Sequence, residues 1–325
     1  MAGAIWVVGE AVDGRLARIG GEVATVARSL GEAAGREVVG IVVDVSPDAA
    51  AAELAAFVPR VLAVTEPAAA DHAWATLAAT RLAALIEREG PAYILVGASP
   101  DGRDLAGTLS VLLGWGVLAN AVALAWGAGG PTVEMSVFGG RLLTTSGFTA
   151  DHGIVTLRPN VVTAAPASGV GSVQAAGAPV PVELPAVAVL ERVAEAGAAA
   201  PIEEATVIVA GGRGVGGPGG FAIVEELANA LGGVVGATRA AVDAGWIGYA
   251  RQIGQTGKIV KPSLYVALGI SGAIQHKVGM QTAGTIVGIN RDPDAPLAEF
   301  ADLYVVGDLF EIVPAVLAEL RARHG

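Results

Sequence analysis

The sequence of 325 residues contains no cysteine, which excludes disulfide bonds and cysteine-ligated metal or iron–sulfur centres. Lysine is nearly absent too: the chain has Lys258, Lys261 and Lys277, all within 254–290. The formal net charge is −11, and no cluster of basic residues is visible along the chain. Nucleic acid is therefore not an expected partner, because its backbone is bound by clustered arginine and lysine.

Long apolar runs are missing as well. No window reaches the roughly 18 consecutive apolar residues that a membrane-spanning helix needs. The first ten residues also lack the basic leader of a secretory signal. We therefore expect a cytoplasmic protein without a membrane span.

Aromatic residues make up only 5% of the chain, although 53% of it is hydrophobic. Alanine, valine, glycine and leucine supply the bulk, which favours helices packed closely on a sheet over a β-sandwich. The length suffices for two domains of ordinary size. An alanine- and glycine-rich run at 194–200 indicates the boundary, so we predict an N-terminal domain at 1–196 and a C-terminal domain at 202–325.

The N-terminal domain alternates apolar runs of strand length with amphipathic stretches of helix length, which predicts a mostly parallel α/β sheet with helices on both faces. Strand-like runs at 133–138, 141–145 and 154–162 follow one another after short turns, and we expect them to add antiparallel strands. No element is predicted at 164–178, whereas 180–184 is strand-like. Asp101 is predicted to cap the helix that follows the strand at 93–96. A nucleotide-binding loop at 99–104 is the alternative.

The C-terminal domain opens with a strand and then a loop, 211–220, that contains seven glycines. So many glycines permit close approach of the backbone to a ligand. Arg213 in this loop suits a pyrophosphate through forked hydrogen bonds, with an ordinary solvated arginine as the alternative. The spacing does not match the G-x-G-x-x-G fingerprint with its later acid, so an ordinary NAD site is not supported.

The stretch 254–290 is the densest in polar groups between apolar runs. It contains a glycine-bracketed loop with Thr256, a buried strand at 264–268, a small-residue turn with Ser271, and then a helix start with Gln275 and His276. Free backbone N–H groups at a helix start receive phosphate. We interpret the stretch as a site for a large, phosphate-bearing, aromatic ligand, although such turns also occur for packing reasons alone.

Polar residues follow each predicted strand of this domain. In an open, doubly wound parallel sheet the carboxyl ends of the strands meet at one edge, where ligands bind. The sheet would therefore gather these side chains in one crevice: Arg213, Thr238, Arg239, Ser271, Asn290 and Asp308.

Five segments of the C-terminal domain, in this order and spacing, resemble the alpha subunits of electron-transfer flavoproteins. They are GGRG at 211–214, GATRAAVDAG at 236–245, GQTGK at 254–258, GISGAIQH at 269–276 and INRDPDAP at 289–296. The resemblance covers nearly all of 205–325, and the N-terminal half shares the β/α layout and the SPDGRDL segment. The family often has serine where this chain has Thr238, so a hydroxyl is kept.

The resemblance implies a heterodimer with a beta subunit, one FAD in the C-terminal domain of this chain, and AMP in the partner. It implies that Arg213 contacts the flavin end, Thr256 lies near N5 of the ring, and His276 lies near the ring carbonyl O2, where Arg239 adds charge. The imidazole would act as a donor whose protonation lies within reach of neutral pH. The full set of implied cofactor-binding residues is Arg213, Thr238, Arg239, Ile253, Gly254, Gln255, Thr256, Ser271, Gly272, Ala273, Ile274, Gln275, His276, Asn290, Asp308 and Leu309.

The implied role is that of an electron carrier rather than an enzyme that turns over a substrate alone; no nucleophile–base pair and no metal site is expected. Electrons would come from acyl-CoA and other flavin dehydrogenases of fatty acid β-oxidation and pass to an electron-transfer flavoprotein:quinone oxidoreductase. Two alternatives stay open: a bifurcating flavoprotein whose beta subunit carries a second FAD, and a nucleotide-binding module of the same fold without a redox role.

Overall fold

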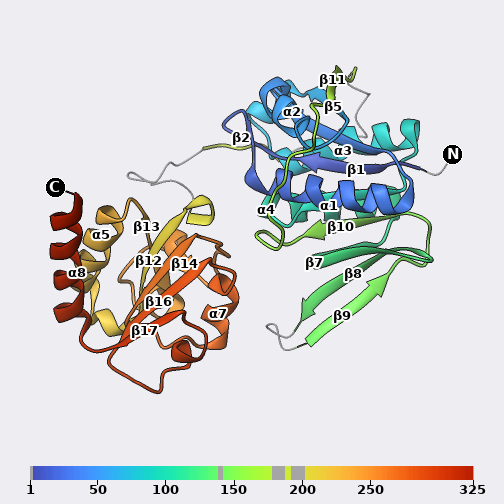
Figure 1. Cartoon of the computed structure of the whole chain (residues 1–325). Helices are drawn as coiled ribbons and strands as arrows, with labels where there is room; N and C mark the ends of the chain where they lie inside the picture. The colour runs from blue at the N-terminus through green and yellow to red at the C-terminus, as the bar shows by residue number, and fades with distance from the viewer. Residues whose placement is uncertain (1–2, 138–141, 178–186, 192–201, 325) are drawn as a thin grey trace. The chain divides into compact units, whose positions relative to one another are not determined.

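The computed structural model describes residues 3–137, 142–177, 187–191 and 202–324. The chain divides into two compact units, Met1–Val193 and Ala194–Gly325 (Figure 1). The predicted boundary at 197–201 and the predicted strand at 180–184 lie outside the described residues.

The helices and strands of the N-terminal unit begin and end close to the residues at which the apolar pattern of the sequence predicts them to begin and end. The main strands are β1 (Ile5–Gly9), β4 (Val38–Asp44), β5 (Arg60–Thr65), β6 (Tyr93–Gly97), β7 (Val117–Gly127), β8 (Gly130–Val137), β9 (Leu142–Gly147), β10 (Gly153–Leu157) and β11 (Ser172–Ala175). The helices are α1 (Arg18–Ala34), α2 (Asp48–Leu54), α3 (Trp74–Glu89) and α4 (Pro100–Leu113), and β2 (Ala11–Val12) pairs with β3 (Arg15–Leu16).

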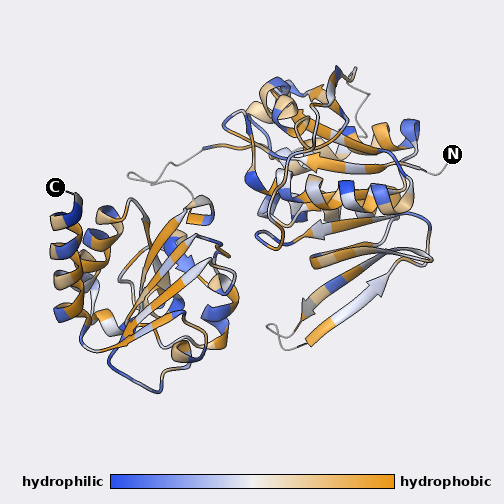
Figure 2. Cartoon of the chain, viewed as in Figure 1, coloured by the Kyte–Doolittle hydropathy of each residue, from blue (hydrophilic) through white to orange (hydrophobic). Residues whose placement is uncertain are grey.

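These strands form, among the described residues, one sheet of nine in the order β11-β5-β4-β1-β6-β10-β7-β8-β9. All pairs from β11 to β7 are parallel, and β8 and β9 extend the β7 edge as antiparallel strands. The mostly parallel sheet with antiparallel additions is thus confirmed. β1 is buried along its whole length, and Figure 2 shows most of it in the hydrophobic colour, as expected for a strand covered on both faces.

Two expectations about this sheet are wrong. The strand at 153–157 is not an antiparallel addition, because it lies between β6 and β7 and is parallel to both. The segment 164–178 does contain a strand, β11, which pairs with β5. All four residues of β11 are exposed, and the alternation Ser-Val-Gln-Ala is only four residues long, so the sequence carries no apolar run that would indicate a buried strand here.

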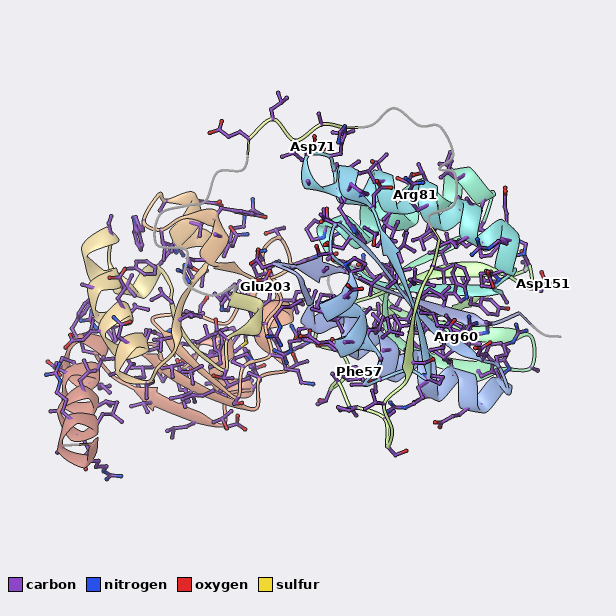
Figure 3. The ribbon with its side chains drawn as sticks, turned by 90° about the horizontal axis from the view of Figure 1, so that it is seen from above. Phe57, Arg60, Asp71, Arg81, Asp151 and Glu203 are labelled. Atoms are coloured by element: carbon purple, nitrogen blue, oxygen red, sulfur yellow. The ribbon has the colours of Figure 1, made fainter. Side chains whose placement is uncertain are left out.

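A nearly buried ion pair ties α3 to the loop after β5. Arg81, labelled in Figure 3, pairs with Glu66, whose side chain is 5% exposed. Glu66 also accepts a hydrogen bond from the backbone N–H of Ala68. The carboxylate therefore has partners on both sides, as a buried charge requires.

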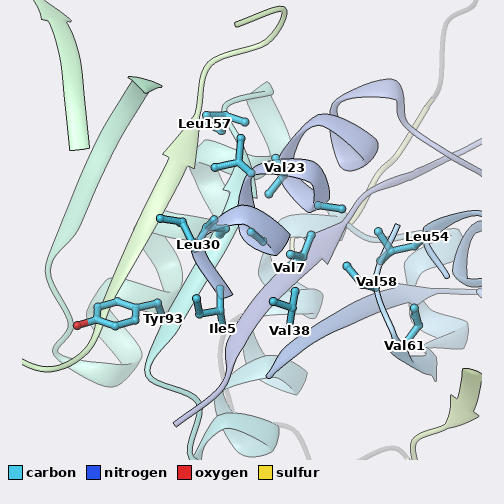
Figure 4. Packing of buried hydrophobic residues seen from close by; sticks show 14 of the residues in the cluster. Ile5, Val7, Val23, Leu30, Val38, Leu54, Val58, Val61, Tyr93 and Leu157 are labelled. Atoms are coloured by element: carbon cyan, nitrogen blue, oxygen red, sulfur yellow. The ribbon is translucent and has the colours of Figure 1, made fainter. Parts of the chain in front are cut away.

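Two hydrophobic clusters cover the two faces of this sheet. Along β1, Ile5 and Val7 face one cluster, with α1 and α2, and Trp6 and Val8 face the other, with α3 and α4. This alternation is the period of two that a strand imposes on its side chains. Figure 4 shows Val7 of β1 with Val23 and Leu30 of α1 among the side chains of the first cluster.

A buried carboxyl lies where β1 and β6 end. Glu10 follows β1 and is 8% exposed, and both of its carboxyl oxygens lie 2.7 Å from Ser99 Oγ. Ser99 accepts a hydrogen bond from Gly102 N (2.8 Å) and so caps α4; the cap predicted at Asp101 is wrong, since Pro100 already occupies the first helical position. Burial raises the pKa of Glu10 from 4.5 to about 7; the Ser99 hydrogen bond opposes the rise and Asp101 adds to it.

The C-terminal unit is a parallel sheet with helices on both faces. Its strands are β12 (Val207–Gly211), β13 (Val234–Thr238), β14 (Gln252–Ile253), β15 (Leu264–Leu268), β16 (Thr285–Asn290) and β17 (Leu303–Val306). Its helices are α5 (Phe221–Ala230), α6 (Arg239–Asp243), α7 (Ile274–Met280) and α8 (Leu309–His324).

The strand order is β14-β13-β12-β15-β16-β17, and every pair is parallel. The chain thus winds outward from β12 in one direction and from β15 in the other, which confirms the doubly wound fold. Residues of α5 and α8 belong to the hydrophobic cluster on one face, and Met280 of α7 belongs to the cluster on the other. The topological switch point lies between β12 and β15, at whose carboxyl ends such folds bind ligands.

Candidate functional site

The backbone at the switch point is packed so tightly that side chains are excluded. Gly212 N donates to Leu268 O (2.9 Å), and Gly214 N donates to Gly269 O (3.0 Å). A Cβ atom on Gly269 would lie 2.6 Å from Gly214 Cα, and Gly269 has a φ of +60°. Part of the glycine-rich loop therefore serves the contact between the ends of β12 and β15.

Other glycines of the same loop have space beside them. A Cβ atom on Gly216, Gly217 or Gly219 would meet nothing within 4 Å. Arg213, between the tightly packed Gly212 and Gly214, is exposed. The loop thus presents bare backbone and a guanidinium at the carboxyl edge of the sheet, where both can reach an anionic ligand.

The hydroxyl of Thr238 is buried without a partner. Among the residues that the structure describes, Thr238 Oγ1 is the buried side-chain polar atom that has no hydrogen-bond partner. Thr238 ends β13, and it pairs in register with Ile253 of β14. A buried hydroxyl left unpaired costs about 1–3 kcal/mol, so this atom is a natural place for a ligand oxygen. The neighbouring Arg239 forms an exposed ion pair with Asp243 (3.1 Å).

Hydrogen bonds join the loop after β14 to both ends of α7. Gln255 N donates to Gln275 O (2.7 Å), and Val260 N donates to Gly279 O (2.8 Å). Gly254 has a φ of +139°, and a Cβ atom there would lie 2.7 Å from Gln275 O. The two segments that the sequence places 20 residues apart therefore form one surface at the sheet edge.

His276 lies beneath that surface. Its ring is buried, with Nδ1 3.1 Å from Ile253 O and Nε2 2.8 Å from the hydroxyl of Tyr265. Because a carbonyl only accepts, Nδ1 carries the proton and Nε2 accepts from Tyr265. Burial lowers the pKa of His276 to about 4, against a smaller opposing effect of the Ile253 hydrogen bond. The expectation that this imidazole titrates near neutral pH is wrong, because the ring is buried. The spacing of residues in the sequence does not indicate that burial.

The remaining predicted residues lie along the same edge, with different surroundings. Ser271 is exposed, and Asn290 Nδ2 donates to Ile270 O (3.0 Å). Asp308 accepts from Phe310 N (2.9 Å) and so caps α8, and its hydrogen-bonded ion pair with Arg291 lowers its pKa. The side chain of Leu309 is buried in the hydrophobic core. That these residues contact a cofactor stays a prediction.

Comparison with known proteins places both units in one family. Residues 5–188 match the model of the electron transfer flavoprotein domain, and residues 201–281 match the electron transfer flavoprotein FAD-binding domain. An electron transfer flavoprotein subunit alpha from Mycobacterium leprae is 43% identical over the full length of both chains. The chain belongs to the family of electron transfer flavoprotein alpha subunits.

Two further members of the family cover nearly the whole chain. The alpha subunit from Mycobacterium tuberculosis is 42% identical over 99% of both chains. The alpha subunit from Bacillus subtilis is 35% identical over 97% of this chain and 96% of its own length. The resemblance seen in the five sequence segments is thus confirmed over both units.

Tyr265 and Gln252 are polar residues of this family member that sequence reasoning missed. Tyr265 is fully buried in β15, and Gln252, in β14, is 3% exposed. A signal exists for Tyr265: a phenol in the middle of a buried strand needs a hydrogen-bond partner.

The structure also describes no helix long and apolar enough to cross a membrane, and no group of three or more acidic or histidine side chains that could hold a metal ion.

We expect Tyr265→Phe to weaken the fold of the C-terminal unit. The change keeps the ring but leaves Nε2 of His276 buried without a donor, at a cost of about 1–3 kcal/mol. Urea denaturation at pH 8, where His276 is neutral, measures the loss. Tyr304→Phe is the control, because the Tyr304 hydroxyl bonds the Asp292 carbonyl at the surface. Equal losses in both variants would contradict a special role for the Tyr265–His276 bond.

Proposed function

We propose that this chain binds FAD in its C-terminal unit and, as a heterodimer with an electron transfer flavoprotein beta subunit, carries electrons between other flavoproteins. The observation that carries the proposal is the unpaired buried hydroxyl of Thr238 at the same sheet edge as the open glycines 216, 217 and 219. Neither feature stabilises the protein by itself, and both suit a ligand with many oxygens.

The residues present fit FAD. The open glycines suit an anionic pyrophosphate, Arg213 suits the flavin end, and Thr238 offers a hydroxyl to a phosphate or ribityl oxygen. Ile253, Gly254, Gln255 and Thr256 would hold the flavin side. Turn residues, from Ser271 through Gly272, Ala273 and Ile274 to Gln275, would hold the chain of the cofactor, and Asn290, Asp308 and Leu309 the adenosine.

FAD, when bound, supplies the redox chemistry, and the protein supplies position and electrostatics. Neutral His276 brings no full positive charge to the site; it holds the Ile253 carbonyl in place through its Nδ1 proton. Arg213 and Arg239 are the cations whose charge would favour a more negative, reduced ring.

The finer parts of the proposal concern partners. The donors are acyl-CoA dehydrogenases and other flavin dehydrogenases, the acceptor is an electron-transfer flavoprotein:quinone oxidoreductase, the beta subunit carries AMP, and the complex works in fatty acid β-oxidation in the cytoplasm. The experiment is co-expression with the beta subunit, followed by spectroscopy and analysis of bound nucleotides. A yellow heterodimer with one FAD and one AMP supports the proposal. A second FAD favours the bifurcating alternative, and a colourless complex that refuses FAD contradicts the proposal.

We expect Thr238→Val to weaken FAD binding without destabilising the chain. Valine has the shape of threonine but lacks the hydroxyl, so the FAD-free protein loses an unpaired buried polar atom and keeps or gains stability. The dissociation constant for FAD rises by roughly fivefold, the equivalent of one hydrogen bond of about 1 kcal/mol. Flavin fluorescence titration and urea denaturation give the two numbers.

Thr156→Val is the control for this substitution. The Thr156 hydroxyl is buried in the N-terminal unit and accepts from Asn120 N (2.9 Å), so its loss should destabilise the chain. If Thr238→Val costs as much stability as Thr156→Val and leaves FAD affinity unchanged, Thr238 is a structural residue.

A further inference from the structure

The loop that carries Thr256 closes on itself through backbone hydrogen bonds. Lys258 N donates to Gln252 O (2.7 Å), Gly254 N donates to Lys258 O (3.1 Å), and Gly257 N donates to Gly254 O (3.1 Å). Lys258 is also held from outside by an ion pair of 2.6 Å with Glu203, which is labelled in Figure 3. The loop is therefore fixed at both ends.

The side chain of Gln252 is held inside this loop. It is buried, and a Cβ atom on Gly257 would lie 2.4 Å from Gln252 O and 2.9 Å from Gln252 Cγ. Glycine at 257 thus leaves room for the glutamine. From there, Gln252 Nε2 donates to Thr256 Oγ1 at 3.1 Å.

This bond determines what the Thr256 hydroxyl can offer to a ligand. A hydroxyl has one proton and two lone pairs. The amide N–H of Gln252 occupies a lone pair, so the hydroxyl proton points away from Gln252. Thr256 is exposed at the sheet edge, so that proton is available to a bound molecule.

We infer that Gln252 is a positioning residue that makes Thr256 a hydrogen-bond donor toward the flavin ring. The inference rests on the proposed function, because it requires FAD beside Thr256. Gln252 acts on the ring through the Thr256 hydroxyl, because its amide nitrogen donates a hydrogen bond to Thr256 Oγ1.

The backbone of Thr256 is held independently of Gln252. The hydroxyl of Tyr249 donates to Thr256 O at 2.8 Å. Removing the Gln252 amide therefore leaves the Thr256 backbone in place and changes the direction of its hydroxyl. That separation makes the inference testable with side-chain substitutions.

The decisive variant is Gln252→Glu in the full chain with its beta subunit and FAD. An ionised carboxylate only accepts, so the Thr256 hydroxyl would donate its hydrogen bond to the carboxylate and present a lone pair to the ring. A protonated carboxyl can donate as the amide does. We expect the variant to bind FAD roughly fivefold to tenfold more weakly at high pH and to recover near wild-type affinity at low pH. The ¹⁵N resonance of labelled flavin N5 should report the same titration, and wild type should show neither change.

Two further variants keep the test decisive. In a Thr256→Val background, Gln252→Glu should produce no pH-dependent change, since no hydroxyl is left to turn. Gln252→Met, which keeps the shape without the donor, should shift the N5 resonance at every pH, and this shift should also vanish with Thr256→Val. If Gln252→Glu fails to fold, the methionine pair decides the matter.

The outcomes separate the inference from the proposed function. Wild-type complex that binds no FAD would sink the proposed function. Wild-type complex that binds FAD, with pH-dependent effects of Gln252→Glu that persist without the Thr256 hydroxyl, would overturn the inference alone. An N5 resonance that none of the variants moves would overturn it as well.

Discussion

Replacing Gly269 with alanine is expected to destabilise the C-terminal unit by about 2–5 kcal/mol and to remove bound FAD. Two costs add at this position. The new methyl group would lie 2.6 Å from Gly214 Cα and 2.8 Å from Gly214 C, where only backbone can move, and overpacking of this kind costs about 1–3 kcal/mol. The φ of +60° adds about 1–2 kcal/mol for any residue with a Cβ.

Two control variants separate these costs. Gly214→Ala brings a methyl group equally close, 2.6 Å from Gly269 Cα, at a residue without a positive φ. Gly232→Ala has a φ of +64°, but its methyl group would meet nothing within 4 Å. Gly214→Ala thus measures the steric cost, Gly232→Ala measures the backbone cost, and Gly269→Ala should approach their sum.

Flavin retention distinguishes the same three variants. The ends of β12 and β15 border the proposed FAD site, so Gly269→Ala and Gly214→Ala should lose flavin during gel filtration, whereas Gly232→Ala should keep it. Urea denaturation and flavin absorbance are measured on the same samples. If Gly232→Ala loses as much stability as Gly269→Ala, the close approach of the two strand ends contributes nothing.

Most of the architecture could be predicted because local pattern and global fold agree. Continuous apolar runs such as 38–43 and 264–268 are strands of a sheet covered on both faces, and they became β4 and β15. The strand order itself could not be predicted. β10 lies between β6 and β7, and no residue within 153–157 indicates which strands are its neighbours.

The polar contacts of the candidate site were beyond sequence reasoning for a related reason. Their placement at one sheet edge follows from the parallel topology, and this was predicted. The partners of His276, however, lie 11 and 23 residues away, at Tyr265 and Ile253. Burial of an imidazole depends on such contacts, so its low pKa is a property of the packing. Glu10 shows the same limit, since only the return of Ser99 after β6 buries it.

These two buried groups give the two units opposite responses to pH. For Glu10, the unfolded chain releases the carboxyl proton near pH 4.5, whereas the folded chain keeps it to about pH 7. Between these values unfolding releases a proton, so stability falls as pH rises. The difference of 2.5 pH units corresponds to about 3 kcal/mol.

For His276 the sign is reversed. The unfolded imidazole binds a proton below pH 6.5, whereas the folded one stays neutral to about pH 4. Between these values unfolding takes up a proton, so stability rises with pH, again by about 3 kcal/mol at most. The N-terminal unit should therefore be more stable at pH 5 than at pH 8, through Glu10, and the C-terminal unit less stable.

The measurement uses the full chain and compares variants with wild type at each pH. Glu10→Gln keeps the shape of the side chain and cannot ionise, so its stability relative to wild type should rise by about 3 kcal/mol between pH 4.5 and pH 7. Four of the five tryptophans lie in the N-terminal unit, and Trp246 lies in the other. Fluorescence of wild type and Trp246→Phe during urea denaturation therefore assigns each transition to its unit.

Hydrogen exchange adds an independent assignment, because it reads 5–44 and 264–290 separately in the same sample. Glu10→Gln should change protection in the first segment and leave the second unchanged. His276→Gln should do the opposite, with its pH dependence between about pH 4 and pH 6.5 removed. A Glu10→Gln variant whose stability relative to wild type is the same at pH 5 and pH 8 would show that the carboxyl is ionised throughout. The contact between Glu10 and Ser99 would then be an ordinary hydrogen bond to a carboxylate.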